Sequence, residues 1–600
     1  MQTLLVLLLV AAVHMAVHVR TWLRVGLLAD DRHMVGGAIL RHRGVWTFES
    51  MFLPEAVTGA TTALYRPFID LLFWLEQPWF GVEAFGYHVV NSSMHCGTAM
   101  VWFVLVRRWS GSVVAALATA VLFVGWPGHS EATHWIAART TVQSTFLSSV
   151  ALLVLDGALV QKGVWRRGAR LWLAGCFAVL AVGSKESAVF VVPLATLLCW
   201  MRAPEGFAIV RRTLAALSAV APMLLGVAGW LWWRASRIGS WGSGTQYGWH
   251  LQRVTMEPCS DWISVLLAPV HGDYTPRVWV VVLVVLHTAL LATALLACRA
   301  PGARRALAIG ALLLLQGYLA GIGLERLDLN TLENVRYSYE PALGLTVMLA
   351  LGIASLPRRA RGPALAVLVL AHAIVLDGNR RSWLRAAAVY QRMEHDIGQV
   401  ALRTQAPIRV LDAPGVYDGA FAFLNSFTEF RFMQEFAPPG ANLRGAVSST
   451  QEWRDVLREM AAAAANKQGL EQAFTVQWDD GALAPFTLDP QWPQEPWPGT
   501  TFGYACVART RPFTGSRLPV HMLVRSAAQL ELQLRARCGE RTWSDEPVLM
   551  FPGADPQAIG LRLALPGDLT AEQRVDVELV VRKGNDERTF ALGSVVLAHR

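Results

Sequence analysis

The stretch LLADDRHMV, residues 27–35, follows the first long apolar run of this 600-residue chain. Two neighbouring carboxylates, Asp30 and Asp31, therefore stand at the end of a segment apolar enough to lie in a membrane. Carboxylates in that position are costly unless they face a water-filled cavity or a polar partner. The stretch thus predicts a membrane-spanning chain with a polar cavity beside these two residues.

The composition agrees with a membrane protein. Hydrophobic residues make up 54% of the chain and charged residues 16%, with a mean hydropathy of +0.36. Soluble domains carry about 25% charged residues, so much of this chain is expected to face lipid. The net charge of +9 comes almost entirely from arginine. The arginines gather in short loops between apolar runs, where they set membrane topology, so we expect no nucleic-acid partner.

The apolar runs predict about eleven crossings. Basic clusters occur in every second loop, as expected of cytoplasmic loops, so the amino terminus is predicted to be cytoplasmic. The first run lacks the basic region and the cleavage site of a signal peptide, and we interpret it as a retained helix. The runs lie near 3–20, 86–106, 112–126, 140–160, 171–183, 187–201, 213–233, 277–298, 306–323, 338–356 and 362–377.

Two of these runs are short for a crossing. Residues 171–183 and 187–201 reach about 20 Å each, against a hydrocarbon core of about 30 Å. The turn between them, Ser184-Lys185-Glu186, is therefore expected to lie below the outer surface. Lys185 stands out because lysine occurs elsewhere only at positions 162, 467 and 583.

The character of the chain changes after the last apolar run. We predict a membrane domain over 1–380 and a soluble α+β or β-sandwich domain over 381–600. The second domain is expected to be periplasmic, because the amino terminus is predicted to be cytoplasmic and the number of crossings is odd. Residues 381–400 and 451–467 are expected to form amphipathic helices. Later segments alternate between apolar and polar residues, as strands do. The sequence Lys583-Gly584-Asn585-Asp586 is expected to join the last two strands as a hairpin.

Cysteines in the second domain suggest a cross-link. Cys506 and Cys538 are predicted to lie in a compartment where disulfides persist. We therefore expect a Cys506–Cys538 disulfide, which would close a loop of about 30 residues.

Two histidines lie in the first apolar run. His14 and His18 are one helical turn apart and share a face. They are suited either to polar contacts inside a helix bundle or to a metal. We favour the polar contacts and assign no metal ligand, without excluding a divalent metal.

Six polar motifs recur in the loops predicted to face outward. They are LLADDRHMV (27–35), LYRPFIDLLFWLE (64–76), GYHVVNSSMH (86–95), WPGHSEATHWIAAR (126–139), SKESAVFVVP (184–193) and NVRYSYEPALGL (334–345). In this order they resemble the GT-C superfamily of membrane glycosyltransferases that use polyprenyl-phosphate sugars. The likeness is greatest to the protein O-mannosyltransferase-like branch, which includes the transmembrane proteins with TPR tails and their bacterial relatives.

The resemblance covers roughly residues 1–385 and implies a GT-C fold. The matching positions are Asp30, Asp31, Tyr65, Arg66, Pro67, His88, Asn91, His95, Pro127, His129, Glu131, Ala132, Arg139, Lys185, Glu186, Pro193, Arg336, Tyr337 and Pro341. The chain departs from the family pattern at Trp126, Ala138, Thr141 and Glu340, and it lacks TPR repeats.

Transfer from a lipid phosphate requires a base for the acceptor hydroxyl and cations for the leaving phosphate. Asp30 or Asp31 can be the base, and we favour Asp31; the alternative is a helix cap or an acidic surface turn. Because two adjacent carboxylates repel each other, one is expected to hold its proton longer.

Candidate phosphate ligands are the cations of the outward-facing motifs. Arginine suits bidentate phosphate contact and lysine a point charge. Lys185 is alternatively one half of an ion pair with Glu186, and the arginines alternatively extend toward the membrane surface. His129 and Glu131 suit a proton relay, a metal or a structural hydrogen bond. The predicted donor-binding residues are Lys185, Glu186, Arg139, Arg336, Arg66, His129 and Glu131.

These features predict an integral membrane glycosyltransferase. It would move a sugar from a polyprenyl-phosphate carrier to a protein, lipid or glycan acceptor, on the outer face of a bacterial inner membrane. Two other classes are a lipid-linked oligosaccharide transporter or flippase, and a non-catalytic membrane scaffold. A transporter would be expected to show internal symmetry and charges at mid-membrane in several helices, and the sequence shows neither.

The alternating basic loops make the topology testable. Reporter fusions at residue 380 should be active only with a reporter that works in the periplasm, because the loop charges place this position outside. A reporter active only in the cytoplasm serves as the paired control, and a signal from it at residue 380 would contradict the predicted number of crossings.

Overall fold

The structure is a computed structural model. It describes residues 2–28, 30–52, 65–204, 206–238, 266–267, 274–321, 335–404, 408–411, 416–417, 420–421, 447–451, 474–479, 482–485, 490–497, 500–505, 517–526, 528–550, 552–564 and 573–596. The chain forms two compact units. The first contains Met1–Ala388 with Val416–Ala422, and the second contains Val389–Gly415 with Phe423–Arg600.

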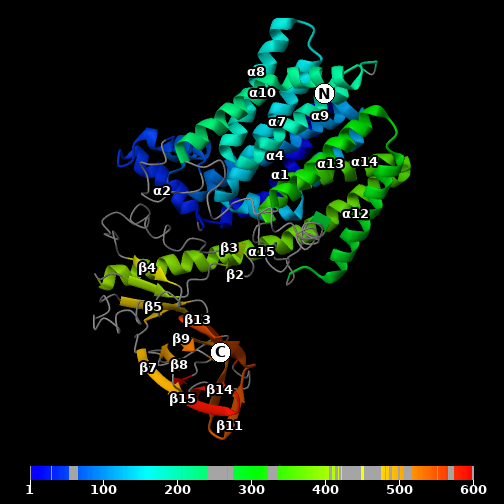
Figure 1. Cartoon of the computed structure of the whole chain (residues 1–600). Helices are drawn as coiled ribbons and strands as arrows, with labels where there is room; N and C mark the ends of the chain where they lie inside the picture. Colours follow the sequence, from blue (N-terminus) through cyan, green and yellow to red (C-terminus); the bar gives the residue numbers. More distant parts are fainter. Residues whose placement is uncertain are drawn as a thin grey trace. The chain divides into compact units, whose positions relative to one another are not determined.

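Helices build the first unit (Figure 1). The α-helices are α1 (Gln2–Arg24), α2 (Asp31–His42), α3 (Pro67–Phe80), α4 (Ala84–Ser110), α5 (Val113–Val124), α6 (Ser130–His134), α7 (Arg139–Leu159), α8 (Val164–Ser184), α9 (Val191–Arg202), α10 (Ile209–Ile238), α12 (Arg277–Ala297), α13 (Pro301–Gly321), α14 (Tyr339–Ser355) and α15 (Arg358–Thr404). Short 3-10 helices include η1 (Phe48–Met51), η3 (Pro127–His129), η4 (Ile136–Ala138), η5 (Glu186–Phe190) and η7 (Val335–Ser338).

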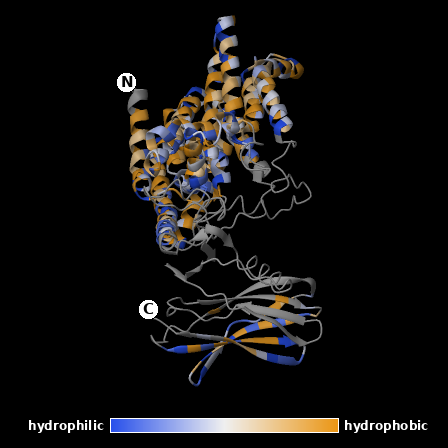
Figure 2. Ribbon diagram, turned by 90° about the vertical axis from the view of Figure 1, so that its left-hand side faces the viewer, coloured by the Kyte–Doolittle hydropathy of each residue, from blue (hydrophilic) through white to orange (hydrophobic). Residues whose placement is uncertain are grey.

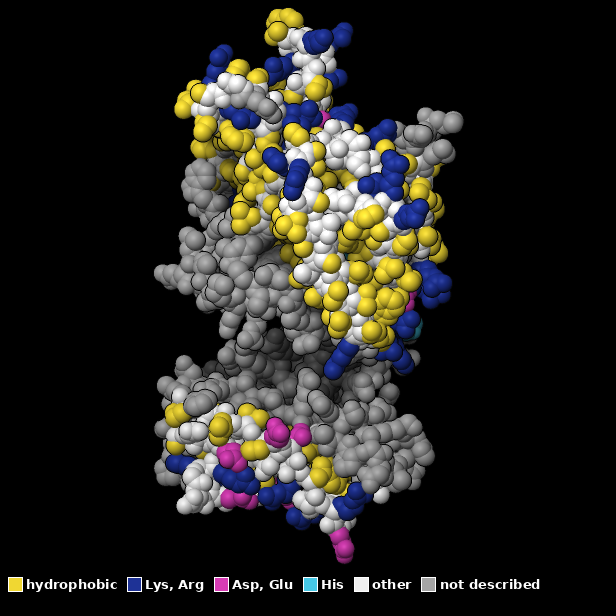
Figure 3. All heavy atoms as spheres, turned by 90° about the vertical axis from the view of Figure 1, so that its right-hand side faces the viewer, with side chains coloured by type: hydrophobic (Ala, Val, Ile, Leu, Met, Phe, Trp, Pro, Cys, Tyr) yellow, Lys and Arg dark blue, Asp and Glu magenta, His cyan; other side chains and the backbone are white. Residues whose placement is uncertain are grey.

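By length and apolar composition, seven of the described helices can cross a membrane. The number is eight if the bent pair Val113–Val124 and Pro127–His134 counts as one span. The ribbon of the helical unit carries much of the hydrophobic colour in Figure 2, and Figure 3 shows many apolar and few acidic side chains on one face of this unit. The chain is therefore a helical, multi-pass membrane protein with a β-rich carboxyl-terminal part.

The predicted count of about eleven crossings is not reached among the described helices. The predicted runs 171–183, 187–201 and 306–323 are not in the membrane-spanning set. Length and charge explain why the first two of these runs do not qualify as membrane spans. α9 has 12 residues, and α8 carries three arginines in its first two turns.

The turn between α4 and α5 shows how local sequence sets the helix ends. Gly111 ends α4 with a φ of 69°, a left-handed conformation that favours glycine. Ser112 then caps α5, because its hydroxyl accepts a hydrogen bond from the amide of Ala115 at 3.1 Å. Gly111 and Ser112 thus connect the two apolar helices in a short turn.

Helix α14 lies at the centre of the first unit. Every residue from Tyr339 to Ile353 is buried. Neighbouring helices approach its backbone closely, because a Cβ at Gly344 would meet the carbonyl oxygen of Gly310 on α13, and one at Gly352 would meet that of Leu290 on α12. Small residues permit such approaches between membrane helices.

Helix α15 corrects one prediction. The predicted span near 362–377 and the predicted amphipathic helix 381–400 belong to one continuous helix, Arg358–Thr404. The sequence Asp377-Gly378-Asn379 does not break it, because Asp377 forms ion pairs with Arg380 and Arg381 one turn further on. Such pairs stabilise a helix locally.

The second unit is built from strands. They form one sheet in the order β4-β1-β5-β6, a second in the order β13-β9-β8-β7, and a third in the order β11-β10-β14-β15 with β12 beside β10. The strands of the first unit and of these sheets are β1 (Ile408–Leu411), β2 (Val416–Tyr417), β3 (Ala420–Phe421), β4 (Val447–Gln451), β5 (Phe474–Asp479), β6 (Ala482–Pro485), β7 (Pro490–Trp497), β8 (Thr500–Ala505), β9 (Arg517–Ser526), β10 (Leu530–Cys538), β11 (Arg541–Ser544), β12 (Val548–Met550), β13 (Gly553–Ala564), β14 (Arg574–Lys583) and β15 (Asp586–Val596).

The carboxyl-terminal sheets share a hydrophobic core. Val524 and Leu563 of one sheet cluster with the inward residues of β10 and β14 from the other. The alternation along these strands is visible in Figure 2. The predicted β-rich fold and the hairpin are confirmed, with Lys583 paired to Asp586 across Gly584 and Asn585.

Two other predictions for this part have different outcomes. The predicted helix 451–467 falls almost entirely outside the described residues. Cys538 is a free thiol at the end of β10, so the predicted disulfide is not formed in this structure. Its predicted partner, Cys506, lies outside the described residues.

Candidate active site

Asp31 begins α2 and is fully buried. Its Oδ2 accepts a hydrogen bond from the amide of Leu28 at 2.9 Å, and its Oδ1 accepts one from the amide of Ala137 in η4 at 2.6 Å. Burial raises the pKa of Asp31 to about 8, although these backbone donors favour the charged form. Asp31 therefore joins the end of α1 to η4, more than 100 residues away.

Asp30 occupies a different environment from its neighbour. It is partly exposed, with backbone angles φ −61° and ψ −11°, and its side chain makes no capping hydrogen bond to α2. The alternative interpretation of Asp30 as a side-chain helix cap therefore fails. Of the two carboxylates, Asp30 is the one that solvent or a ligand can reach.

Arg139 is fully buried at the start of α7. Its guanidinium donates to Glu76 Oε2 of α3 at 2.5 Å and to the carbonyl of Tyr87 at 2.6 Å. The ring of Phe73 lies 4.5 Å from its Cζ. The structure thus places Arg139 in a buried ion pair, apart from the other predicted phosphate ligands.

Glu131 and Arg336 form a second ion pair. Glu131 lies fully buried in α6, accepts a hydrogen bond from the amide of Arg336 at 2.7 Å and also binds the guanidinium of Arg336. The Cζ of Arg336 lies 5.2 Å from the ring of Trp135, two residues before the Ala137 amide that binds Asp31. The aspartate pair and Arg336 therefore meet at the same loop.

His129 is placed beside this pair but turns inward. Its Nδ1 donates to the carbonyl of Phe123 at 3.0 Å, and its ring lies 4.4 Å from that of Tyr339. The side chain is fully buried. Its Nδ1 thus has a structural partner, whereas its Nε2 is buried without a hydrogen-bond partner.

Lys185 lies between α8 and η5 and is 7% exposed. Its ammonium donates to the Thr141 hydroxyl at 2.7 Å and lies 4.7 Å from the ring of Tyr337. Burial lowers the pKa of Lys185 to about 8, Glu340 opposes the shift, and Arg66 and Arg336 add to it. The prediction that this turn is sunk into the protein is consistent with that burial.

Glu186 is shared by two arginines. Its Oε2 accepts hydrogen bonds from Arg66 at 2.9 and 3.2 Å, and its Oε1 accepts one from Arg234 at 3.3 Å. Although burial favours the protonated acid, Arg66 and Arg234 hold the pKa of Glu186 below its ordinary value. The alternative Lys185–Glu186 ion pair is replaced by this arrangement.

Arg234 was missed by the sequence reasoning. It is 2% exposed near the end of α10. The available signal was its position after the tryptophans of GWLWWR (229–234), where an apolar helix reaches the outer boundary of the membrane. Position alone did not reveal its partner, because Glu186 is 48 residues away.

Four cations therefore gather around Glu131, Glu186 and Glu340. Lys185 interacts electrostatically with Arg66, Arg336 and Glu186, and it also acts on Glu131. The set, here called the cation cluster, consists of Lys185, Arg66, Arg234 and Arg336. Its carboxylate partners are Glu131, Glu186 and Glu340.

The polar face of α4 packs inside the unit. His88 Nε2 donates to the carbonyl of Val25 at 2.9 Å, and Asn91 donates to that of Ala132 at 3.0 Å. Both side chains are fully buried. They fix the end of α1 and the α6 loop against α4.

Comparison with known proteins gives short matches to curated sequences. No family model matches the chain. It is 29% identical to protein O-mannosyl-transferase Tmtc1 of Drosophila melanogaster over 150 residues, 25% of this chain and 17% of that protein. It is 28% identical to tmtc2 of Xenopus laevis over 130 residues, 21% of this chain and 15% of that protein. The chain thus matches about a sixth of the length of these relatives, and the predicted resemblance to O-mannosyltransferases is confirmed.

Two solved structures have a distantly similar arrangement. ArnT from Cupriavidus metallidurans, bound to undecaprenyl phosphate, has a TM-score of 0.45 at 13% identity, covering 78% of this chain and 92% of its own. The oligosaccharyltransferase AglB from Archaeoglobus fulgidus, with an inhibitory peptide and a dolichol-phosphate, has a TM-score of 0.44 at 10% identity, covering 100% and 99%. Both likenesses are distant.

The two assignments open to Arg139 are separable by experiment. In Arg139→Met, Glu76 loses its partner, and breaking a buried pair costs about 3–5 kcal/mol. We expect a clear drop in the thermal unfolding midpoint of the detergent-purified protein, and partial recovery in the double variant Arg139→Met/Glu76→Leu. If Arg139→Met unfolds like wild type but fails to bind undecaprenyl phosphate, the arginine is a donor ligand instead.

Proposed function

We propose that this chain is an integral membrane glycosyltransferase of the GT-C type. It transfers a sugar from a polyprenyl-phosphate carrier to a protein, lipid or glycan hydroxyl, on the outer face of a bacterial inner membrane. The observation that carries the proposal is the partly exposed Asp30 next to Asp31, which is linked to the cation cluster through the α6–η4 loop. The sequence matches to protein O-mannosyltransferases support transfer to a hydroxyl.

Asp30 acts as the base, and Asp31 is a positioning residue. Both oxygens of Asp31 are engaged by backbone amides, and its side chain has no exposed surface. Since its pKa is raised to about 8, Asp31 holds a proton near neutral pH and adds no repulsive charge beside Asp30. This assignment reverses the sequence-based preference for Asp31.

The cation cluster receives the lipid phosphate. Arg66, Arg234 and Arg336 already bind carboxylates, so they are held in fixed orientations. Lys185 instead contacts a hydroxyl and an aromatic ring, and its ammonium can approach a phosphate oxygen. Preorganised cations of this kind stabilise the charge that develops on a leaving group.

The reaction follows from these two parts. Asp30 takes the proton of the acceptor hydroxyl as its oxygen attacks the anomeric carbon of the sugar. The bond between that carbon and the phosphate oxygen breaks, and the bonding electrons leave with the lipid phosphate. The phosphate is a stable anion, so a general acid is not required, and the cation cluster stabilises its charge.

The Asp30 assignment predicts two distinct variant phenotypes. Asp30→Asn should lower turnover by about 100-fold or more, the scale of general-base loss, with little change in abundance. Asp31→Asn should reduce abundance and thermal stability, because an amide can accept at only one of the two backbone donors. The measurement is complementation of a deletion strain, scored by the lipid-phosphate sugar that accumulates, with immunoblots for abundance.

Two outcomes would change the conclusion. Normal turnover in the Asp30→Asn/Asp31→Asn double variant would show that neither aspartate is the base and that the proposed mechanism is wrong. Loss of turnover in Asp31→Asn at full abundance, with Asp30→Asn active, would restore Asp31 as the base. The conservative control is Asp30→Glu, which keeps the carboxylate.

Lys185 provides a test of the phosphate site. Lys185→Ala should weaken binding of undecaprenyl phosphate by about 10- to 100-fold, the range for a hydrogen bond to a charged group. Since burial lowers the pKa of Lys185 to about 8, wild-type affinity should fall as pH rises through this value, because the ammonium loses its proton. Lys185→Arg should remove this pH dependence, since arginine stays charged.

Binding measured by calorimetry in detergent across this pH range distinguishes these cases. Thr141→Val is the matched variant, because it removes the hydroxyl that holds Lys185 while keeping the charge. Equal affinity in Lys185→Ala and wild type would make Lys185 structural.

A further inference from the structure

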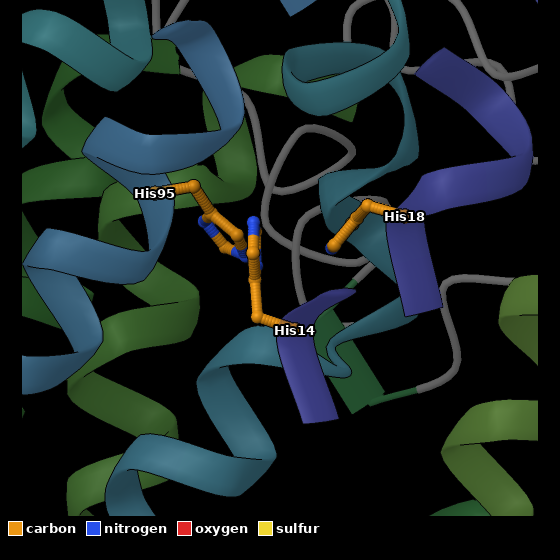
Figure 4. A group of neighbouring side chains, drawn as sticks. All are labelled: His14, His18 and His95. Atoms are coloured by element: carbon orange, nitrogen blue, oxygen red, sulfur yellow. The ribbon is translucent and has the colours of Figure 1, made fainter. Parts of the chain in front are cut away.

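Three histidines from two helices converge inside the first unit. His14 and His18 lie one turn apart on α1, and His95 lies on α4. The ring centroids are 4.7 Å apart for His14 and His18, 5.7 Å for His14 and His95, and 5.5 Å for His18 and His95. Figure 4 shows the three side chains directed into one common space. One ring nitrogen from each lies within 4.8 Å of the others.

The surroundings leave these imidazoles incompletely satisfied. Their exposed fractions are 5%, 1% and 0%. Nδ1 of His14 is buried without a hydrogen-bond partner. His18 and His95 each contact the same carbonyl oxygen, that of Val124, through Nε2 at a long 3.4 Å. Polar groups buried in a membrane helix are costly without partners and are a sign of function.

Two of the rings are oriented by bonds from outside the group. His14 Nε2 contacts the Ser92 hydroxyl at 2.8 Å, and His95 Nδ1 contacts the Tyr339 hydroxyl at 2.6 Å. The other nitrogen of His14, Nδ1, is left without a partner, and that of His95, Nε2, makes only the long contact with Val124. Metal-binding histidines are oriented by such outer partners, which fix the ring and its tautomer.

From this geometry we infer that His14, His18 and His95 bind one divalent transition-metal ion, with Zn²⁺ as the ion that the donor set fits best. Two histidines one turn apart on a helix are an established way to supply two zinc ligands, and α4 supplies the third. Imidazole suits zinc, whereas Ca²⁺ and Mg²⁺ prefer oxygen. Zn–N bonds of about 2.0–2.1 Å place neighbouring nitrogens about 3.3 Å apart, which small rotations of the three rings achieve.

The proposed site is distinct from the donor site and has a structural consequence. It ties α1, which leads into the aspartate pair, to α4. Through the His95–Tyr339 contact it also reaches the start of α14, three residues after Arg336. The metal would therefore fix the spacing of elements that carry the base and one member of the cation cluster, without itself touching the donor.

The test uses the full-length protein in detergent. The protein is stripped with a chelator, reloaded with Zn²⁺ and freed of unbound metal, and bound zinc is measured by inductively coupled plasma mass spectrometry. We expect about one equivalent per chain, with a higher thermal unfolding midpoint after reloading. Reloading with Co²⁺ should give the intense visible absorption of a tetrahedral site. Wild-type protein that retains less than about a tenth of an equivalent would overturn the inference.

Variants assign the metal to these residues. His14→Gln and His95→Gln should each abolish the bound zinc and the stabilisation by zinc. The matched control is His372→Gln, which alters another buried imidazole contact, that between His287 and His372 at 3.0 Å, and should leave the zinc content unchanged. Full zinc content in both His14→Gln and His95→Gln would overturn the inference. If these variants do not fold, the stripping and reloading of wild type decides it.

Discussion

The two backbone hydrogen bonds that Asp31 accepts constrain the rest of the candidate site. One bond holds Leu28, in the segment that follows α1, and the other holds Ala137 of η4, which leads into α7. A buried carboxylate has few ways to be satisfied, so these two bonds fix the separation of both segments. Trp135 and Ala137 belong to the same short loop, and Arg336 packs on the first of them. The position of Arg336, and with it Glu131, follows from this constraint.

The cations of the candidate site are paired with glutamates, with the exception of Lys185. Arg139, Arg336 and the pair Arg66 and Arg234 are each matched by a glutamate, which repays part of the desolvation cost. Lys185 instead donates to Thr141 and lies over Tyr337, and its pKa is lowered to about 8. The contacts of this ammonium with a hydroxyl and an aromatic ring are weaker than those of an arginine with a carboxylate. The lysine is therefore the member of the cluster most able to exchange its contacts for a phosphate.

The sequence predicted what depends on periodicity and turn chemistry. The burial of His88 and Asn91 on α4, the depth of Lys185 and the hairpin at Gly584 follow from spacing, helix length and a positive φ. Pairwise contacts were not predictable, because Glu76 and Arg139 are 63 residues apart and Glu186 and Arg234 are 48 apart. The environments of Asp30 and Asp31 were also not predictable, because only the contact with η4 determines which of the two carboxylates is covered. The sequence predicted a break in α15 near Gly378. The helix is continuous there, and ion pairs of Asp377 with Arg380 and Arg381 lie across the expected break.

Charged side chains and histidines occupy different parts of the first unit. Charged side chains that matter to the proposed chemistry lie at helix ends and loops, at the start of α2, at η5 and η7, and near the end of α10. The interior helices α1 and α4 instead carry histidines, which can be buried neutral at far lower cost than a charge. A neutral imidazole is also the form that binds a transition metal. A cation placed among these rings would compensate three desolvated side chains at once. Desolvation makes the three clustered imidazoles costly without a metal and makes them a favourable ligand set with one. Metal binding by the histidines of α1 would therefore stabilise the elements around Asp30.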